Sequence, residues 1–179
     1  FHPTSVLETG YDILFFWVAR MILMSQFALG EVPFKTVYLH GLVRDKDRQK
    51  MSKSKGNVVD PLGIVEEYGA DALRMALIFG TGLGGDTIIS EEKVRGMRNF
   101  GTKLWNIARF INTDFSNQFP TEDRSRKRYR AKTPADELIL RELENTKDIV
   151  TRSIEDYRFH LAAEVLYDFI WNKFAAVYV

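Results

Sequence analysis

Two lysines three residues apart, with small hydroxyl side chains beside them, are the strongest candidates for chemistry in this 179-residue sequence. They belong to the stretch Lys-Met-Ser-Lys-Ser, residues 50–54, which is followed by Gly56. The surrounding lysine loop, residues 44–55, carries six basic side chains against two acidic ones, a net charge of +4. Ammonium groups bind phosphate oxygens as mobile point charges, and hydroxyl and loop N–H groups add donors. The pattern suggests a loop that closes over a polyphosphate, although charge alone favours a solvated turn.

A second group of candidates lies near the start of the chain. Residues 8–12, which include Gly10 and Asp12, directly follow the first expected strand. Ile13 and Trp17 are four residues apart and would lie on one face of a helix. From the residues alone this apolar pair is more easily explained as ordinary core than as a ligand pocket.

The sequence predicts a strand, a helix and a second strand as the elements that position these residues. Residues 4–7 and 36–43 have the composition of buried strands, and residues 11–28 that of a helix buried on most sides. The apolar stretch at 13–24 is shorter than the ~20 residues of a membrane span. Apolar strands joined through a helix indicate a parallel pair in an α/β sheet, which binds ligands at the carboxyl ends of its strands. Both candidate groups follow such ends.

Short helices and a glycine-rich loop are expected after the lysine loop. Asp60 can cap a helix that begins at Pro61 and closes at Gly69, and Asp71 can cap the next helix. The glycines of residues 80–86 satisfy the G-x-G-x-x-G spacing, but they follow a helix rather than a strand. A dinucleotide site is therefore not expected there.

From residue 90 onward the sequence predicts long amphipathic helices. The expected inner face of the first consists of Val94, Met97, Gly101, Leu104, Ala108 and Ile111. A second helix starts at Thr133-Pro134 with Ile139, Leu143, Thr146, Val150 and Ile154 inside, and a third, from about residue 159, uses Ala162, Val165, Leu166, Phe169 and Phe174. The fold class expected is α/β followed by all-α. Residues 1–89 would form the α/β part and residues 90–179 an incomplete antiparallel helical bundle.

Two features of the helical part could contact nucleic acid. Trp105 would either pack in the core, which its spacing favours, or stack on an RNA base. The basic run from Arg124 to Lys132, with Tyr129 inside it, could bind phosphates or be a solvated linker.

Several stretches resemble one family. Residues 50–54 match the second signature of class I aminoacyl-tRNA synthetases, and they follow a strand that ends in His40-Gly41, as in that family. Residues 8–17, Glu-Thr-Gly-Tyr-Asp-Ile-Leu-Phe-Phe-Trp, look like the corresponding segment of the valyl-tRNA synthetases. Residues 98–110 resemble the first helix of the family's anticodon-binding bundle. The resemblance implies the last part of a Rossmann-like catalytic domain followed by a truncated anticodon-binding domain.

The resemblance also implies roles for the candidate residues. Lys53 would be the main triphosphate contact and Lys50 its helper, together stabilising the transition state in which pyrophosphate leaves. The remaining nucleotide contacts would come from Met51, Ser52, Ser54, His40, Gly10 and Asp12. Asp12, Ile13 and Trp17 would line the amino-acid pocket, which reverses the core interpretation of the apolar pair.

The implied parent enzyme activates valine with ATP, supported by Mg²⁺, and transfers it to tRNA(Val). We expect it to be cytoplasmic and monomeric, with no membrane partner. The family's first ATP-binding signature is not found in these residues, so the chain alone is expected to be inactive. Two alternatives remain: a fragment of an isoleucyl- or leucyl-tRNA synthetase, or a non-catalytic tRNA-binding module.

Composition narrows the possibilities further. The chain has 25 basic and 24 acidic residues and no cysteine, which excludes disulfides, thiolate metal sites and cysteine nucleophiles. The three histidines, His2, His40 and His160, are far apart in the sequence, and we expect no metal site among them.

Overall fold

The computed structural model describes the backbone of residues 1–116 and 131–179, and the side chains of 1–113 and 131–179. The chain forms two compact units. Residues 1–59 and 81–90 make up the first, called the sheet unit, and residues 60–80 and 91–179 make up the second, called the helical unit. The two units do not test the expected boundary near residue 90 between the α/β part and the helical bundle, so this boundary stays a prediction.

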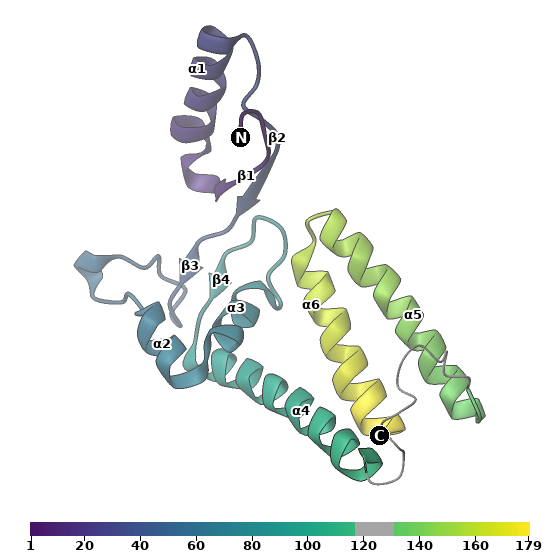
Figure 1. The fold of residues 1–179 in the computed structure, drawn as a ribbon. Helices are drawn as coiled ribbons and strands as arrows, with labels where there is room; N and C mark the ends of the chain where they lie inside the picture. The colour runs from purple at the N-terminus through teal and green to yellow at the C-terminus, as the bar shows by residue number, and fades with distance from the viewer. Residues whose placement is uncertain (117–130) are drawn as a thin grey trace. The chain divides into compact units, whose positions relative to one another are not determined.

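The sheet unit contains two small parallel sheets (Figure 1). Strands β1 (Thr4–Gly10) and β2 (Phe34–His40) pair in parallel, from Thr4 opposite Phe34 to Gly10 opposite His40. The expected parallel pair is therefore confirmed. Strands β3 (Val43–Arg44) and β4 (Thr87–Ile88) form the second sheet. Within the lysine loop, residues Lys53–Lys55 form the single helical turn η3.

Three consecutive helical segments connect β1 to β2 where one helix was expected. They are the 3-10 turn η1 (Tyr11–Ile13), the π turn η2 (Leu14–Val18) and helix α1 (Ala19–Leu29). Of their side chains only Val18 is buried, whereas Phe15, Leu23 and Phe27 are at least 69% exposed. The prediction of a helix buried on most sides is wrong for this unit, because a two-stranded sheet covers only part of such a helix. Residues Tyr11–Leu29 are also long and apolar enough to cross a membrane by length and composition alone.

Within its described residues, the helical unit contains two short and three longer helices followed by a π-helical end. They are α2 (Pro61–Tyr68), α3 (Ala70–Ile78), α4 (Glu91–Ser116), α5 (Pro134–Glu155), α6 (Phe159–Asp168) and η5 (Phe169–Tyr178). Helices α5 and α6 lie side by side (Figure 1). Asp60 caps α2 by accepting from the N–H groups of Leu62 and Gly63, as its position before proline predicts. Helix α3 begins after Gly69, one residue before the expected cap at Asp71.

A cluster of aromatic rings packs around Phe100, which belongs to the buried core of the helical unit. Phe100 of α4 lies with its ring centroid 4.8 Å from that of Tyr167, and Phe79 lies 5.2 Å from the same ring. Tyr167 stacks on Trp171 at 5.6 Å. These separations are those of favourable aromatic pairs, which add to the burial of apolar area. The cluster therefore fixes which face of α4 turns inward.

That inward face agrees with the expected one only at its start. Val94 is buried as expected, but Phe100 and Ile107 are buried in place of Leu104, which is 46% exposed, and Trp105 is 71% exposed. The interpretation of Trp105 as core is wrong, because the contacts of Phe100 with α6 and η5 rotate Trp105 toward solvent. On α5, Thr146 of the expected stripe is buried together with Ser153, while Leu143 and Ile154 of that stripe remain more than a third exposed. The basic run is described only from residue 131 on, so Arg124 to Arg130 lie outside the described residues.

Candidate functional site

The carboxyl ends of β1 and β2 place Gly10 opposite His40. His40 donates from Nδ1 to the Gly41 carbonyl at 2.7 Å, and its Nε2 lies 3.3 Å from Glu8 Oε1. A carbonyl oxygen only accepts, so Nδ1 carries a proton and Nε2 is the nitrogen that faces the carboxylate. The imidazole is thus held in one orientation at the strand end.

Gly10 leaves room for the carboxylate of Asp12. A Cβ at Gly10 would lie 2.8 Å from Asp12 Oδ1, closer than such atoms normally approach. The backbone of Gly10 has φ −65°, which any residue adopts, so the requirement is for space rather than for an unusual conformation. Any larger residue here would push Asp12 out of its place.

The structure brings one lysine of the lysine loop to Asp12, 38 residues earlier in the sequence. Lys50 Nζ lies 3.1 Å from Asp12 Oδ2. The side chains are 60% and 32% exposed, so this ion pair contributes little to stability and is easily exchanged for another partner. Lys50 and Asp12 therefore meet in one place where either could contact a charged ligand.

A polar network that the sequence reading missed orders the lysine loop. Asp45 Oδ1 accepts from the backbone N–H of Gln49 at 2.8 Å, and its Oδ2 accepts from Asn57 Nδ2 at 2.7 Å. Asn57 Oδ1 accepts in turn from the N–H of Ser52 at 3.0 Å. These bonds, led by the one from Asn57, lower the pKa of Asp45 and keep it ionised. Asp and Asn are residues that commonly bond to nearby backbone in turns, which is the signal that could have identified them.

The remaining loop residues differ in exposure. Met51 and Ser52 are half-buried, and the hydroxyl oxygens of Ser52 and Ser54 lie 3.2 Å apart. Lys53 is exposed and forms no ion pair with any residue in the described part of the chain. Its ammonium group is thus available, whereas that of Lys50 is engaged by Asp12.

The two apolar candidates do not lie in one continuous α-helix. Ile13 ends the η1 turn and Trp17 lies in the η2 turn, and they are 44% and 48% exposed. Neither is part of the core of the sheet unit. Their partial exposure leaves apolar surface directly after Asp12.

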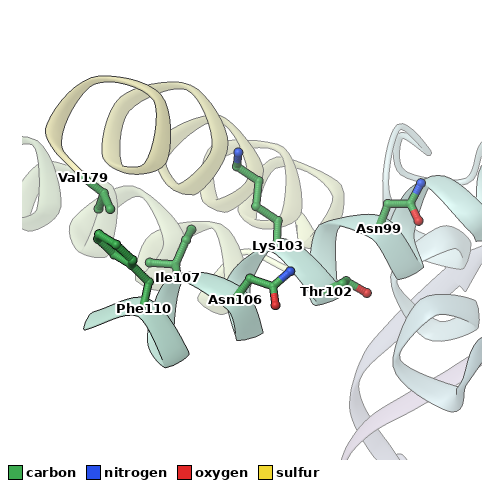
Figure 2. Close-up of a pocket in the computed structure, with 7 residues that line it drawn as sticks. All are labelled: Asn99, Thr102, Lys103, Asn106, Ile107, Phe110 and Val179. Carbon is green, nitrogen blue, oxygen red and sulfur yellow. The ribbon is translucent and has the colours of Figure 1, made fainter. Parts of the chain in front are cut away.

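A separate hollow of about 480 Å³ lies on α4 within the helical unit (Figure 2). Its lining residues are Asn99, Thr102, Lys103, Asn106, Ile107, Phe110 and Val179. Lys103 Nζ also lies 4.6 Å from the centroid of the Trp171 ring. From residue 93 to residue 113 this helix has five basic residues and no acidic one, so α4 presents a cationic surface, and Lys103 of these five lines the hollow.

Comparison with known families covers both parts of the chain. Residues 1–90 match the family model described as tRNA synthetases class I (I, L, M and V). Residues 136–179 match the anticodon-binding domain of tRNA ligase.

Curated relatives match along the whole chain. It is 48% identical over 181 residues to the valine–tRNA ligase of Solibacter usitatus (strain Ellin6076), covering 100% of this chain and 20% of that protein. It is 49% identical over 182 residues to the valine–tRNA ligase of Brucella suis biovar 1 (strain 1330), covering 100% and 19%. The chain therefore spans about one fifth of the length of these relatives.

Among solved structures, the methionyl-tRNA synthetase of Mycobacterium tuberculosis in complex with methionyl-adenylate is similar, with a TM-score of 0.75 and 25% identity over 94% of this chain and 32% of that one. The Agrobacterium radiobacter K84 agnB2 LeuRS, in a ternary complex with tRNA and LeuAMS, has a TM-score of 0.72 and 24% identity over 93% and 22%. These likenesses support the α/β and then all-α fold class.

Proposed function

Because the chain belongs to the class I tRNA synthetases, we propose that it is the segment of a valine–tRNA ligase that holds the lysine loop and part of the anticodon-binding domain. The observation that carries this proposal is the match over the whole chain to valine–tRNA ligases at 48–49% identity. The parent enzyme would react valine with ATP to form valyl-adenylate and pyrophosphate, and would then transfer the valyl group to tRNA(Val). Residues 1–89 would belong to the catalytic domain and residues 90–179 to the anticodon-binding domain.

The lysine loop supplies the cationic half of this chemistry. Attack of the valine carboxylate on the α-phosphate places growing negative charge on the departing pyrophosphate, which fixed cations stabilise. Lys53 is proposed as the main contact because it is exposed and unpaired within the described residues. Met51 would lie beside adenine, and Ser52 and Ser54 would donate to phosphate oxygens. Magnesium would enter bound to the ATP phosphates, through oxygen ligands of the kind it prefers.

Lys50 is proposed to change partners during the reaction. In the structure it neutralises Asp12 at 3.1 Å. The valine ammonium group or a ribose hydroxyl would take its place on Asp12, and the freed lysine would join Lys53 on the pyrophosphate. Because the Lys50–Asp12 pair is exposed, its loss costs little, so the substrate itself can trigger the change.

The amino-acid pocket is proposed to follow Asp12 directly. The carboxylate would orient the ammonium group, while Ile13 and Trp17 would contact the branched side chain. Gly10 and His40, opposite each other at the strand ends, would border the nucleotide. In the longer parent, further segments would cover the exposed apolar side chains of η2 and α1.

A chimeric enzyme tests the proposal. Residues 1–179 would replace the equivalent segment of the Solibacter usitatus valine–tRNA ligase, and pyrophosphate exchange would be measured with valine, isoleucine, leucine and threonine. We expect valine to support exchange best, with threonine the main competitor because an apolar pocket rejects an isosteric hydroxyl only ~100-fold. Preferred exchange with isoleucine or leucine would assign the chain to one of those enzymes instead.

A tRNA partner is proposed for the helical unit. The cationic surface of α4 suits the phosphate backbone, and Trp105 offers an exposed ring on which an unpaired base can stack. If the chain bound tRNA while the chimera showed no exchange, the alternative of a non-catalytic tRNA-binding module would be favoured. The parent enzyme is proposed to work in the cytoplasm as a monomer, without a membrane partner.

A further inference from the structure

We infer that Asp86 is a positioning residue that sets the start of the lysine loop against the turn at residues 8–12. The inference rests on the function proposed above. Asp86 lies outside both candidate groups, at the end of the glycine-rich loop of residues 80–86. Its carboxylate joins three parts of the sheet unit that are far apart in the sequence.

The first two contacts of Asp86 fix the position of the start of the lysine loop. Asp86 Oδ1 accepts from the backbone N–H of Leu42 at 2.8 Å, directly before β3. Its Oδ2 accepts from Arg44 Nε, at the first residue of the lysine loop. The two side chains are 22% and 30% exposed, so the ion pair is shielded better than a surface pair. The Leu42 N–H and the guanidinium lower the pKa of Asp86, and the bond to Asp86 raises the pKa of Arg44, so both stay charged at neutral pH.

The third contact of Asp86 is with Tyr11, in the turn at residues 8–12. The hydroxyl of Tyr11 donates a long hydrogen bond of 3.5 Å to Asp86 Oδ2. Tyr11 is the neighbour of Asp12 in the chain, and Arg44 forms an isolated antiparallel bridge with Lys50. Asp86 therefore contacts Tyr11, which precedes Asp12 in the chain, and Arg44, which pairs with Lys50. A shift of its carboxylate would change the separation of those two groups.

Backbone packing holds Asp86 itself in place. The N–H of Thr87 donates to the Leu42 carbonyl at 3.0 Å, next to the pairing of β3 with β4. A Cβ on Gly41 would lie 1.9 Å from the Gly85 carbonyl oxygen, so only glycine permits this approach of the two backbones. The glycine-rich loop thus places the Asp86 carboxylate at a fixed point beside Leu42 and Arg44.

The test uses Asp86→Asn in the chimeric enzyme. If this substitution displaces the start of the lysine loop by about 1 Å, kcat for valine-dependent exchange should fall by about 100-fold. The KM for valine should change less than about threefold, because loss of an interaction made only in the transition state lowers kcat without weakening substrate binding. Asp86→Asn should also cost much less in an Arg44→Gln background, since the two residues act as a pair. A raised KM with unchanged kcat, or full additivity with Arg44→Gln, would overturn the inference.

Asp136→Asn is the matched control. Asp136 also accepts from backbone N–H groups and from a tyrosine hydroxyl, but it lies at the start of α5. A purely structural role for Asp86 predicts that both variants lose thermal stability and that neither changes kcat. A positioning role predicts a large loss of kcat for Asp86→Asn alone.

A second measurement on the isolated 179-residue chain does not depend on activity. Trypsin cleavage at Lys50, Lys53 and Lys55 should become about tenfold faster in Asp86→Asn, the factor expected when one charged hydrogen bond is lost. Cleavage at Arg141 in α5 is the internal reference. An unchanged ratio would contradict the inference. A chimera without exchange activity but with this change in cleavage would instead count against the proposed function alone.

Discussion

The lysine loop and the core of the helical unit are held together by different kinds of interaction. The loop depends on carboxylates that accept from backbone N–H groups, chiefly Asp45 and Asp86, and its lysines remain at the surface. The helical core depends on buried apolar side chains, among them Phe100, whose ring packs on Tyr167. Polar networks fix directions with little buried apolar area, whereas ring packing supplies area but no reactive group. Changes in the loop should therefore affect catalysis, and changes in the core should affect stability.

The largest expected effect is on catalysis in the loop. Lys53→Ala in the chimera should lower kcat for valine-dependent pyrophosphate exchange by about 100- to 1,000-fold, the usual loss for one stabilising donor at a developing charge. The urea midpoint of the isolated chain should not change, because Lys53 is exposed and unpaired within the described residues. Exchange at the wild-type rate would remove the lysine loop from the proposed mechanism.

The converse effect is expected in the core. Phe100→Ala should lower the free energy of unfolding by about 3–5 kcal/mol, because it leaves a cavity beside Tyr167. Urea denaturation of the 179-residue chain measures this value. Phe110→Ala on the same helix is the control, since Phe110 is 51% exposed and its loss should cost far less. Equal losses would show that the ring cluster does not carry the stability of the unit.

A smaller effect is expected on RNA binding by α4. Trp105→Ala should weaken tRNA binding by the chain about fivefold or more, as loss of one base stack does. Arg109→Gln should lower the salt dependence, the slope of log K against log salt, by about 1. The control Arg141→Gln makes the same charge change on α5, where six acidic residues outnumber three basic ones. Equal effects of the two arginine variants would argue for general charge attraction instead of a defined surface on α4.

The smallest effect is expected at the start of α5. The hydrogen bond from Tyr178, followed by those from the N–H groups of Lys132 and Thr133, lowers the pKa of Asp136 to about 2. A carboxylate with a lowered pKa in the folded state stabilises above its unfolded pKa of about 3.9 and loses that contribution as the pH falls. The stability difference between the wild type and Asp136→Asn should therefore shrink between pH 4 and pH 2. Tyr178→Phe should narrow this pH window. A stability difference between the wild type and Asp136→Asn that stays constant down to pH 2 would contradict the lowered pKa of Asp136.

Local signals in the sequence predicted many elements of the fold. The parallel pair of β1 and β2 follows from apolar strands separated by a helical segment, and Asp60-Pro61 marks the start of α2. Thr133-Pro134 marks the start of α5, where Thr133 and Asp136 form a reciprocal capping box. The helix caps depend on residues within one turn of each other, and the strand pair was predicted from the order of apolar and helical segments, so neither needed the fold.

The candidate site was recognised only in part. The residues of the lysine loop were found by type and spacing and Asp12 through the family resemblance, and Lys50 does meet Asp12. Their roles in binding and catalysis remain predictions. Asp45, Asn57 and Asp86 were missed, because the loop contacts that they make leave no periodic signal in the sequence.

By itself the sequence determined the chemistry available to this protein: a loop of lysines and serines, a carboxylate after a strand, and amphipathic helices. Only the tertiary structure decided which groups meet and which faces turn inward. Trp105 is exposed because Phe100 takes the inner position beside Tyr167, and Asp86 reaches Arg44 because β3 and β4 pair across more than 40 residues of chain. The physical reason is that local propensity acts over a few residues, whereas packing and charge pairing depend on which distant segments the fold brings together.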